Sequence, residues 1–317
     1  MTSRADGSGR LARNMLLGTA GLVLLGLLGM FLGIRLEFNS EGDPMGAVQK
    51  TAISKDGTVI AYEESGSGPT LILVSAALAD RSGNRRLARY LSDRFTVINY
   101  DRRGRGTSGD VSPYKTDNEI DDIEALVNAS GGVAFLFGSS SGSVLALDAA
   151  ARLDPKVRKL YMFEPPFIVD SSRPPMDTSL AGEIDRQVAT GHRSEAVRLF
   201  FTKGMGIPSF GVTFMRLLMP GWSKMCAMAH TIPYDLAILD GTQAGQPLPI
   251  ERWKKASLPT KVAVGSKSEA FFHSGAEGLV KILPTAEYES LAGLNHGALL
   301  LAPKALAKDV QGFLLRP

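Results

Sequence analysis

The sequence predicts a doubly wound α/β domain with a mostly parallel sheet and a helical cap insertion. Short apolar segments at residues 71–74, 95–100, 133–137 and 157–163 alternate with helical patterns, and this alternation is typical of βαβ units. The segment 71–74 is continuously apolar, as expected for a strand that helices cover on both faces. A chain of 317 residues is long enough to form one large domain with an insertion.

The first part of the chain predicts a membrane anchor. Residues 15–34 are uncharged and rich in Leu and Gly, and their number matches the roughly 20 residues that cross a bilayer. Basic residues precede this stretch and acidic residues follow it, which favours a cytoplasmic tail at 1–14 and an extracytoplasmic domain. Signal-peptide cleavage and secretion is the alternative, disfavoured because the stretch is long and lacks an A-x-A cleavage site.

Residues 35–50 are predicted to be a linker because they contain Ser, Gly, Asp and Pro. The folded domain is expected to span residues 51–317. It begins with strands at 51–53 and 58–64, which flank the hairpin sequence Lys55-Asp56-Gly57. The further elements that we expect are helices at 86–91, 120–127 and 143–152, strands at 260–265 and 286–291, and a last helix at about 303–315.

Between about residues 165 and 255 the alternation of strands and helices stops, and Pro, Met and Phe become frequent. We predict that this segment is a helical cap over the carboxyl edge of the sheet. Most of its Met and aromatic side chains should form the core of the cap, and a few should line an apolar substrate pocket.

The overall composition excludes several classes of protein. With 44% hydrophobic residues, 21% charged residues and a net charge of +3, the chain is ordinary for a globular protein and offers no case for nucleic-acid binding. The single cysteine, Cys226, excludes an intramolecular disulfide and a cysteine-based zinc site. Four histidines leave little scope for a metal centre.

The segment Gly138-Ser139-Ser140-Ser141-Gly142 lies between a predicted strand and a predicted helix. In this context G-x-S-x-G predicts a nucleophile elbow, in which a sharp turn exposes the Ser140 hydroxyl. The N-terminus of the following helix, with the Ser141 N–H first, is directed at the place where an oxyanion would form.

A serine hydroxyl needs a base that removes its proton, and His296 is the candidate. It falls in the loop between the last predicted strand and the last predicted helix. This loop belongs to the same edge of the sheet as Ser140, so we predict that His296 is the general base.

These pieces together resemble the α/β-hydrolases, from about residue 51 to the C-terminus. The matching segments are the elbow 138–142, the turn 101–109, Glu164-Pro165-Pro166 and Asn295-His296-Gly297. The resemblance implies an ester-type hydrolase with a Ser-acid-His triad and no cofactor.

The chain departs from the family pattern after its first central strand. The usual His-Gly is Ser75-Ala76 here. By position, the backbone N–H groups of Ala77 and Ser141 would form the oxyanion hole, and backbone donors do not depend on the side chain.

A second departure concerns the acid that orients His296. The family's usual aspartate position holds Ser268. Glu164 is one candidate, because haloalkane dehalogenases of the same fold resemble this chain in keeping a glutamate after the corresponding strand. Glu269, one residue beyond the usual position, is the alternative, and we favour Glu164.

We therefore predict a serine hydrolase that acts on a carboxylic ester or lactone, a small molecule with an apolar acyl or alcohol portion. The alternative is a catalytically idle member of the fold that binds a ligand under its cap. The absence of an aspartate at Ser268 is the main argument for this alternative.

Overall fold

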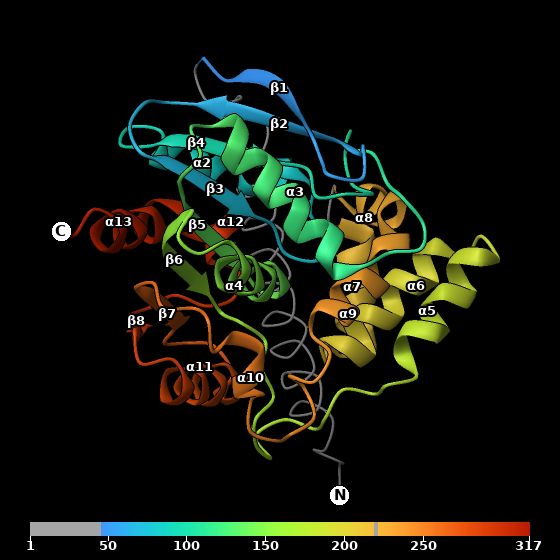
Figure 1. The fold of residues 1–317 in the computed structure, drawn as a ribbon. Helices are drawn as coiled ribbons and strands as arrows, with labels where there is room; N and C mark the ends of the chain where they lie inside the picture. The colour runs from blue at the N-terminus through green and yellow to red at the C-terminus, as the bar shows by residue number, and fades with distance from the viewer. Residues whose placement is uncertain (1–45, 219–220) are drawn as a thin grey trace, which may run out of the picture.

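A sheet of eight strands lies at the centre of the part of the chain that the structure, a computed structural model, describes, namely residues 46–218 and 221–317 (Figure 1). The strands are β1 (Val48–Ile53), β2 (Val59–Ser65), β3 (Thr70–Val74), β4 (Thr96–Tyr100), β5 (Ala134–Ser139), β6 (Val157–Phe163), β7 (Thr260–Gly265) and β8 (Ala286–Leu291). Their order is β1-β2-β4-β3-β5-β6-β7-β8. The pairs β1–β2 and β2–β4 are antiparallel and the others are parallel, so the predicted mostly parallel sheet is confirmed.

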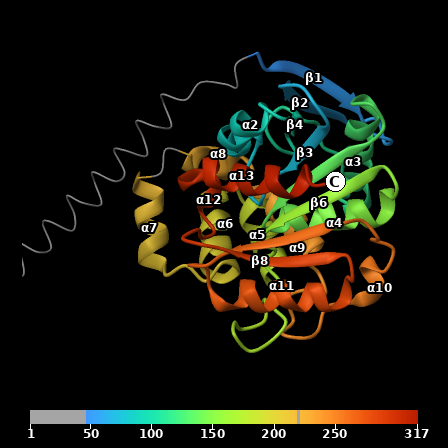
Figure 2. The same ribbon diagram turned by 90° about the vertical axis from the view of Figure 1, so that its left-hand side faces the viewer.

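Helices cover both faces of this sheet (Figures 1 and 2). The apolar residues of β3 show why its sequence is continuously apolar: Ile72 and Val74 belong to one buried core, and Leu71 and Leu73 belong to the other. The first core packs under α3 (Thr116–Ala129), α4 (Ser141–Leu153), α10 (Ile250–Trp253) and α11 (Ala270–Ile282). The second packs under α2 (Arg85–Leu91), which follows the short 3₁₀ helix η1 (Arg81–Asn84), and under α12 (Ala298–Leu301) and α13 (Pro303–Leu314).

The predicted cap is a group of helices between β6 and β7, with a core of its own (Figure 1). Phe201 and Trp222 pack within this core, with ring centroids 6.1 Å apart. The cap elements are α5 (Leu180–Ala189), α6 (Arg193–Leu199), the π-helix η2 (Phe200–Gly204), α7 (Ser209–Leu218), α8 (Trp222–Ala227), the 3₁₀ helix η3 (Ala229–Thr231) and α9 (Ile232–Ile238).

The cap ends earlier than the predicted residue 255. Helix α10 packs against α4 in the layer that covers the sheet, and its Trp253 is fully buried in the core there. The indole N–H of Trp253 donates to Asp148 Oδ1 of α4 at 2.7 Å. Arg252 donates to both carboxylate oxygens of Asp148, at 2.8 and 2.7 Å. These contacts assign residues 250–253 to the sheet domain.

Two further boundaries differ from those expected in the sequence analysis. Strand β1 begins at Val48, which pairs with Glu64, so the last residues of the predicted 35–50 linker belong to the sheet. Helix α4 begins at Ser141 instead of residue 143. Within residues 46–218 and 221–317, no helix has the length and apolarity that crossing a membrane requires. The predicted tail and anchor, residues 1–34, lie outside the described residues.

Candidate active site

Ser140 occupies the turn between β5 and α4, with φ 51° and ψ −129°. Residues other than glycine rarely adopt this region of φ and ψ, and such backbone strain is typical of a nucleophile elbow. A Cβ atom at Gly138 would lie 2.5 Å from Ser143 Cα, and one at Gly142 would lie 2.4 Å from Ser75 O. Both positions therefore require glycine. The turn places Ser140 in the wall of a cavity beneath the cap.

His296 and Glu164 meet at the same edge of the sheet. His296 lies between β8 and α12, and Glu164 follows the last residue of β6. The imidazole Nδ1 is 2.7 Å from Glu164 Oε2. The other carboxylate oxygen, Oε1, accepts hydrogen bonds from Gly265 N at 2.7 Å and from Ser268 Oγ. The end of β7 thus holds the fully buried carboxylate so that one oxygen faces the imidazole.

The imidazole is also fixed by an aromatic contact. The ring of Phe272 stacks on His296, with 4.8 Å between the ring centroids and 23° between the planes. Because Nδ1 is engaged by Glu164, Nε2 is the ring nitrogen left to exchange a proton with a serine. Ser140 and His296 line the same cavity. The structure therefore brings Ser140, His296 and Glu164 together.

The alternative acid, Glu269, lines the same cavity, but its carboxylate faces Arg173 instead of His296. Its side chain is 72% exposed, and its carboxylate is 3.9 Å from Arg173 Nη1. Ser268, at the family's usual aspartate position, donates its hydroxyl hydrogen bond to Glu164. Of the two glutamates, Glu164 is the one that contacts His296, which removes the main argument for an incomplete triad.

The two residues expected to form the oxyanion hole are in contact. Ala77 N donates to Ser141 Oγ at 3.1 Å. Ser141 is the first residue of α4, so its N–H has no acceptor within the helix. The elbow and the loop after β3 thus converge at Ser141.

Sequence reasoning missed Asp235, a residue of α9 that connects the cap to Ser141. Its Oδ1 accepts from Ser141 Oγ and from Arg102 Nη1, both at 2.7 Å, and its Oδ2 accepts from Arg105 Nη2. Asp235 is 1% exposed. Burial raises the pKa of its carboxyl, but Arg102 and Arg105 outweigh burial and hold that pKa below its usual value.

The same two arginines hold the loop that carries Ala77. Arg102 Nη1 donates to Ser75 O at 3.1 Å, and Arg105 Nη1 donates to Ala76 O at 2.7 Å. Both guanidinium groups are buried. The signal that could have revealed this network is the presence of three arginines within the turn 101–109, which need buried carboxylate partners if the turn is not at the surface.

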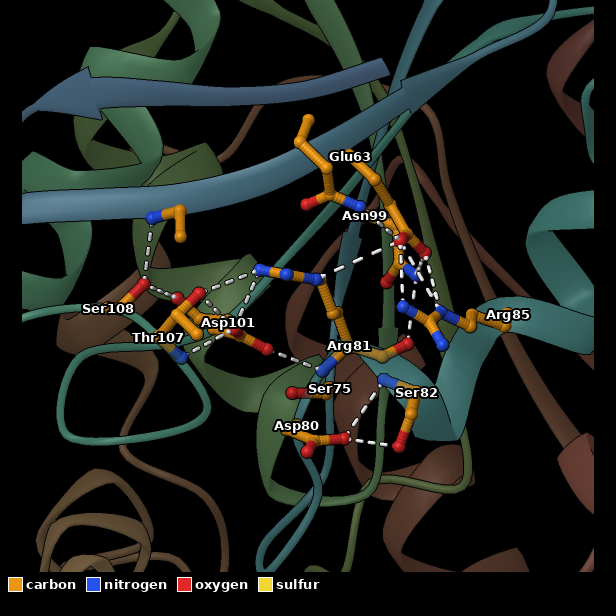
Figure 3. Close-up of polar contacts among 12 residues, drawn as sticks. Glu63, Ser75, Asp80, Arg81, Ser82, Arg85, Asn99, Asp101, Thr107 and Ser108 are labelled. Atoms are coloured by element: carbon orange, nitrogen blue, oxygen red, sulfur yellow. Dashed lines mark hydrogen bonds and ion pairs between the residues drawn. The ribbon is translucent and has the colours of Figure 1, made fainter. Parts of the chain in front are cut away.

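A second polar cluster anchors the far end of this loop (Figure 3). Both the backbone N and the Nη1 of Arg81 donate to the Asp101 carboxylate at 2.8 Å. Asn99 Nδ2 bridges Glu63 Oε1 and the carbonyl of Arg81, at 2.8 Å each. A Cβ atom at Gly106 would lie 2.1 Å from Asp101 Oδ2, so the turn requires glycine there. The 101–109 turn therefore fixes the loop from both ends.

The cavity that Ser140 and His296 share has a volume of about 540 Å³. Its walls are mainly apolar, and Phe200, Phe201 and Met205 of the cap contribute to them. Phe200 and Phe201 also belong to the core of the cap, whereas Trp222 and Met228 belong to that core without lining the cavity. The prediction that a few of the cap's aromatic and Met residues line a pocket, while others form the cap core, agrees with this distribution.

Comparisons with known proteins give concordant results. Residues 71–309 match the profile described as the alpha/beta hydrolase family. The uncharacterized hydrolase YraK of Bacillus subtilis (strain 168) is 30% identical over 166 residues, and the match covers 51% of this chain and 60% of that protein. A non-heme chloroperoxidase of Streptomyces lividans is 24% identical over 277 residues, which cover 83% of this chain and 99% of that protein.

A solved structure shows the same fold at higher identity. An alpha/beta hydrolase from Sphaerobacter thermophilus DSM 20745 is 43% identical and superposes with a TM-score of 0.77, covering 84% of this chain and all of that one. A thermophilic esterase from Thermogutta terrifontis superposes with a TM-score of 0.62 at 19% identity, covering 84% of this chain and 98% of that one.

Proposed function

Because this chain belongs to the alpha/beta hydrolase family, we propose that it is a serine hydrolase that cleaves carboxylic esters or lactones through Ser140, His296 and Glu164. The observation that carries the proposal is the 2.7 Å contact between Glu164 and His296 Nδ1, at a cavity that a strained elbow serine also lines. This arrangement corresponds to a nucleophile, a base and the acid that orients the base.

The chemistry follows from these positions. His296 Nε2 removes the proton of Ser140 as Oγ attacks the acyl carbonyl, and Glu164 stabilises the imidazolium that forms. The Ser141 N–H stabilises the oxyanion. The Ala77 N–H, which donates to Ser141 Oγ in this structure, must turn to the oxyanion to act as the second donor. His296 then protonates the leaving alkoxide, and water activated by the same histidine hydrolyses the acyl-enzyme.

The apolar walls of the cavity support a small-molecule substrate with an apolar acyl or alcohol portion. Burial of methylene groups against Phe200, Phe201 and Met205 supplies about 0.8 kcal/mol for each group. Short-chain esters are therefore expected to react more slowly than esters whose chain fills the cavity.

Labelling with a fluorophosphonate probe tests the nucleophile directly. The full chain is expected to gain one phosphonyl group on Ser140, detected by mass spectrometry of its peptides, and Ser140→Ala should not be labelled. Ser139→Ala is the matched control: the Ser139 hydroxyl is buried without a partner among the described residues, so this variant should still be labelled. Folded wild-type protein that resists the probe would favour the alternative, a ligand-binding protein without turnover.

Residues 15–34 support a single-pass membrane anchor that holds the catalytic domain on the extracytoplasmic side. The full chain, expressed in a bacterial host, is expected to sediment with membranes, to resist extraction by alkaline carbonate and to be degraded by external protease in spheroplasts. A mature soluble protein whose N-terminus lies beyond residue 34 would instead indicate a cleaved signal peptide.

A further inference from the structure

Arg173 places one positive charge in a mainly apolar cavity that Glu269 and Asp235 also line. It lies between β6 and α5, and it lines the same cavity as Ser140 and His296. Of the side chains that line this cavity in the described parts of the chain, it is the only Lys or Arg. Its side chain is 17% exposed.

The protein satisfies only a small part of the hydrogen-bonding capacity of this guanidinium. Arg173 Nη2 donates to Gly204 O at 2.9 Å, and no other hydrogen bond joins the guanidinium to the described residues. An arginine has five N–H donors. The nearest carboxylate, that of Glu269, is 3.9 Å from Nη1 and belongs to a side chain that is 72% exposed. An exposed ion pair of this kind contributes little to stability, because water screens the attraction between its charges.

Two fully buried arginines, Arg102 and Arg103, are held differently. Arg102 donates to both oxygens of Glu119 at 2.7 Å, and Arg103 donates to both oxygens of Asp122 at 2.8 and 2.7 Å. Arg173 has no such two-pronged partner. Burial lowers the pKa of its guanidinium, and Glu269 offsets only part of that effect. A charge-assisted, two-pronged bond to a carboxylate would supply what is missing.

The surroundings fix the guanidinium in place. It lies over the ring of Phe271, 4.6 Å from the centroid. A Cβ atom at Gly206 would come within 3.2 Å of Arg173 Nη2, so the glycine leaves room for the guanidinium. The ring of Phe271 is 4.0 Å from that of Phe272, which in turn stacks on His296. An aromatic wall thus connects Arg173 to the imidazole.

We propose that Arg173 is a specificity-determining residue that binds a carboxylate of the substrate, separated from the scissile ester by an apolar spacer. This inference rests on the proposed function and specifies its substrate class. The carboxylate can belong to the acyl portion, as in a monoester of a dicarboxylic acid, or to the alcohol portion, as in an ester of a hydroxy acid. Arg173 fixes one end of the substrate, and the apolar wall accommodates the spacer.

Two pairs of substrates test the proposal. The first pair is the 4-nitrophenyl monoester of adipic acid and 4-nitrophenyl hexanoate. The second is the acetate ester of 6-hydroxyhexanoic acid and hexyl acetate. The expected result is a higher kcat/KM for the carboxylate member of one pair, which also identifies the portion that carries it. Equal or lower values for the carboxylate member in both pairs would overturn the proposal.

Variants assign such a preference to Arg173. Arg173→Met should lower the ratio of kcat/KM for the carboxylate and neutral esters by about 10- to 100-fold, as expected for loss of a charged hydrogen bond. Arg173→Lys should restore part of the ratio, because lysine keeps the charge but not the two-pronged geometry. Glu269→Gln is the matched control: it removes a neighbouring negative charge and should keep or raise the ratio. A ratio that Arg173→Met leaves unchanged would contradict the assignment.

A binding measurement separates this proposal from the proposed function. Calorimetric titration of Ser140→Ala with hexanoate and with hexanol requires no turnover. Hexanoate should bind more tightly than hexanol, and adding Arg173→Met should remove the difference. If esters are not hydrolysed but this difference is present, the reaction is wrong and the carboxylate site stands. If esters are hydrolysed and Arg173→Met has no effect on hexanoate binding, the carboxylate site is wrong.

Discussion

Replacement of Glu164 with glutamine is expected to lower kcat by about 10³- to 10⁴-fold, the loss that follows when the acid of a Ser-His-Asp triad becomes an amide. Glutamine preserves the shape of the side chain but carries no charge that could stabilise the imidazolium of His296. Its NH₂ group, turned toward Nδ1, would also hold the imidazole in the wrong tautomer. Steady-state hydrolysis of 4-nitrophenyl hexanoate measures the effect, and the melting temperature shows whether the variant is folded.

Two neighbouring substitutions serve as controls for this prediction. Glu269→Gln should retain the wild-type kcat, because Glu269 is exposed and does not contact His296. Ser268→Ala should lose less activity than Glu164→Gln, because Gly265 N still holds the carboxylate. Loss of turnover in Glu269→Gln together with normal turnover in Glu164→Gln would assign the acid to Glu269 instead.

Asp235→Asn is expected to lower the free energy of unfolding by about 3–5 kcal/mol, the usual cost of removing one partner from a buried ion pair. Asparagine fills the same space, but it leaves the buried guanidinium groups of Arg102 and Arg105 without the charge between them. Denaturant unfolding of the two proteins at pH 7 measures the difference. Asp240→Asn, an exposed change just beyond α9, is the matched control and should stay within about 0.5 kcal/mol of wild type.

The pH dependence of this difference has a definite sign. Arg102 and Arg105 hold the pKa of Asp235 below its usual value despite burial, so the folded state keeps the carboxylate ionised at pH values where the unfolded chain binds a proton. The stabilisation is complete above the unfolded pKa of about 3.9 and is lost as the pH falls through the folded pKa. The difference in the free energy of unfolding between wild type and Asp235→Asn should therefore become smaller below about pH 4. A difference that stays constant down to pH 2 would show that it does not arise from the charge of Asp235.

The fold and two positions of the candidate site could be predicted from local sequence. Ser140 is recognisable because an apolar strand, two glycines and a helix surround it, and His296 because of its place before the last helix. The sequence favoured Glu164 over Glu269 but did not decide between them, since both follow strands that end at the same edge of the sheet. The choice depends on which carboxylate the Gly265 N–H binds, and this is decided by the three-dimensional path of the chain.

Asp235 was missed for a different reason. It lies in a short cap helix, far along the chain from Ser141 and from the arginines that bind it. A pattern of apolar residues shows that a helix will be buried on one side, but it does not show which charged groups the opposite layer presents. Only the docking of the cap on the sheet brings these charges together.

That docking limits how the enzyme can admit its substrate. Ile232 of α9 packs in the core of the cap, whereas Ile238 of the same helix packs in the core between the sheet and α4. Lifting α9 would separate Asp235 from two guanidinium groups and expose all three charges. The roof of the cavity therefore has a fixed side at α9, and we expect any opening of the cavity to involve the opposite side, at η2 and the segment that leads from it to α7. Substrate and product should exchange through that side.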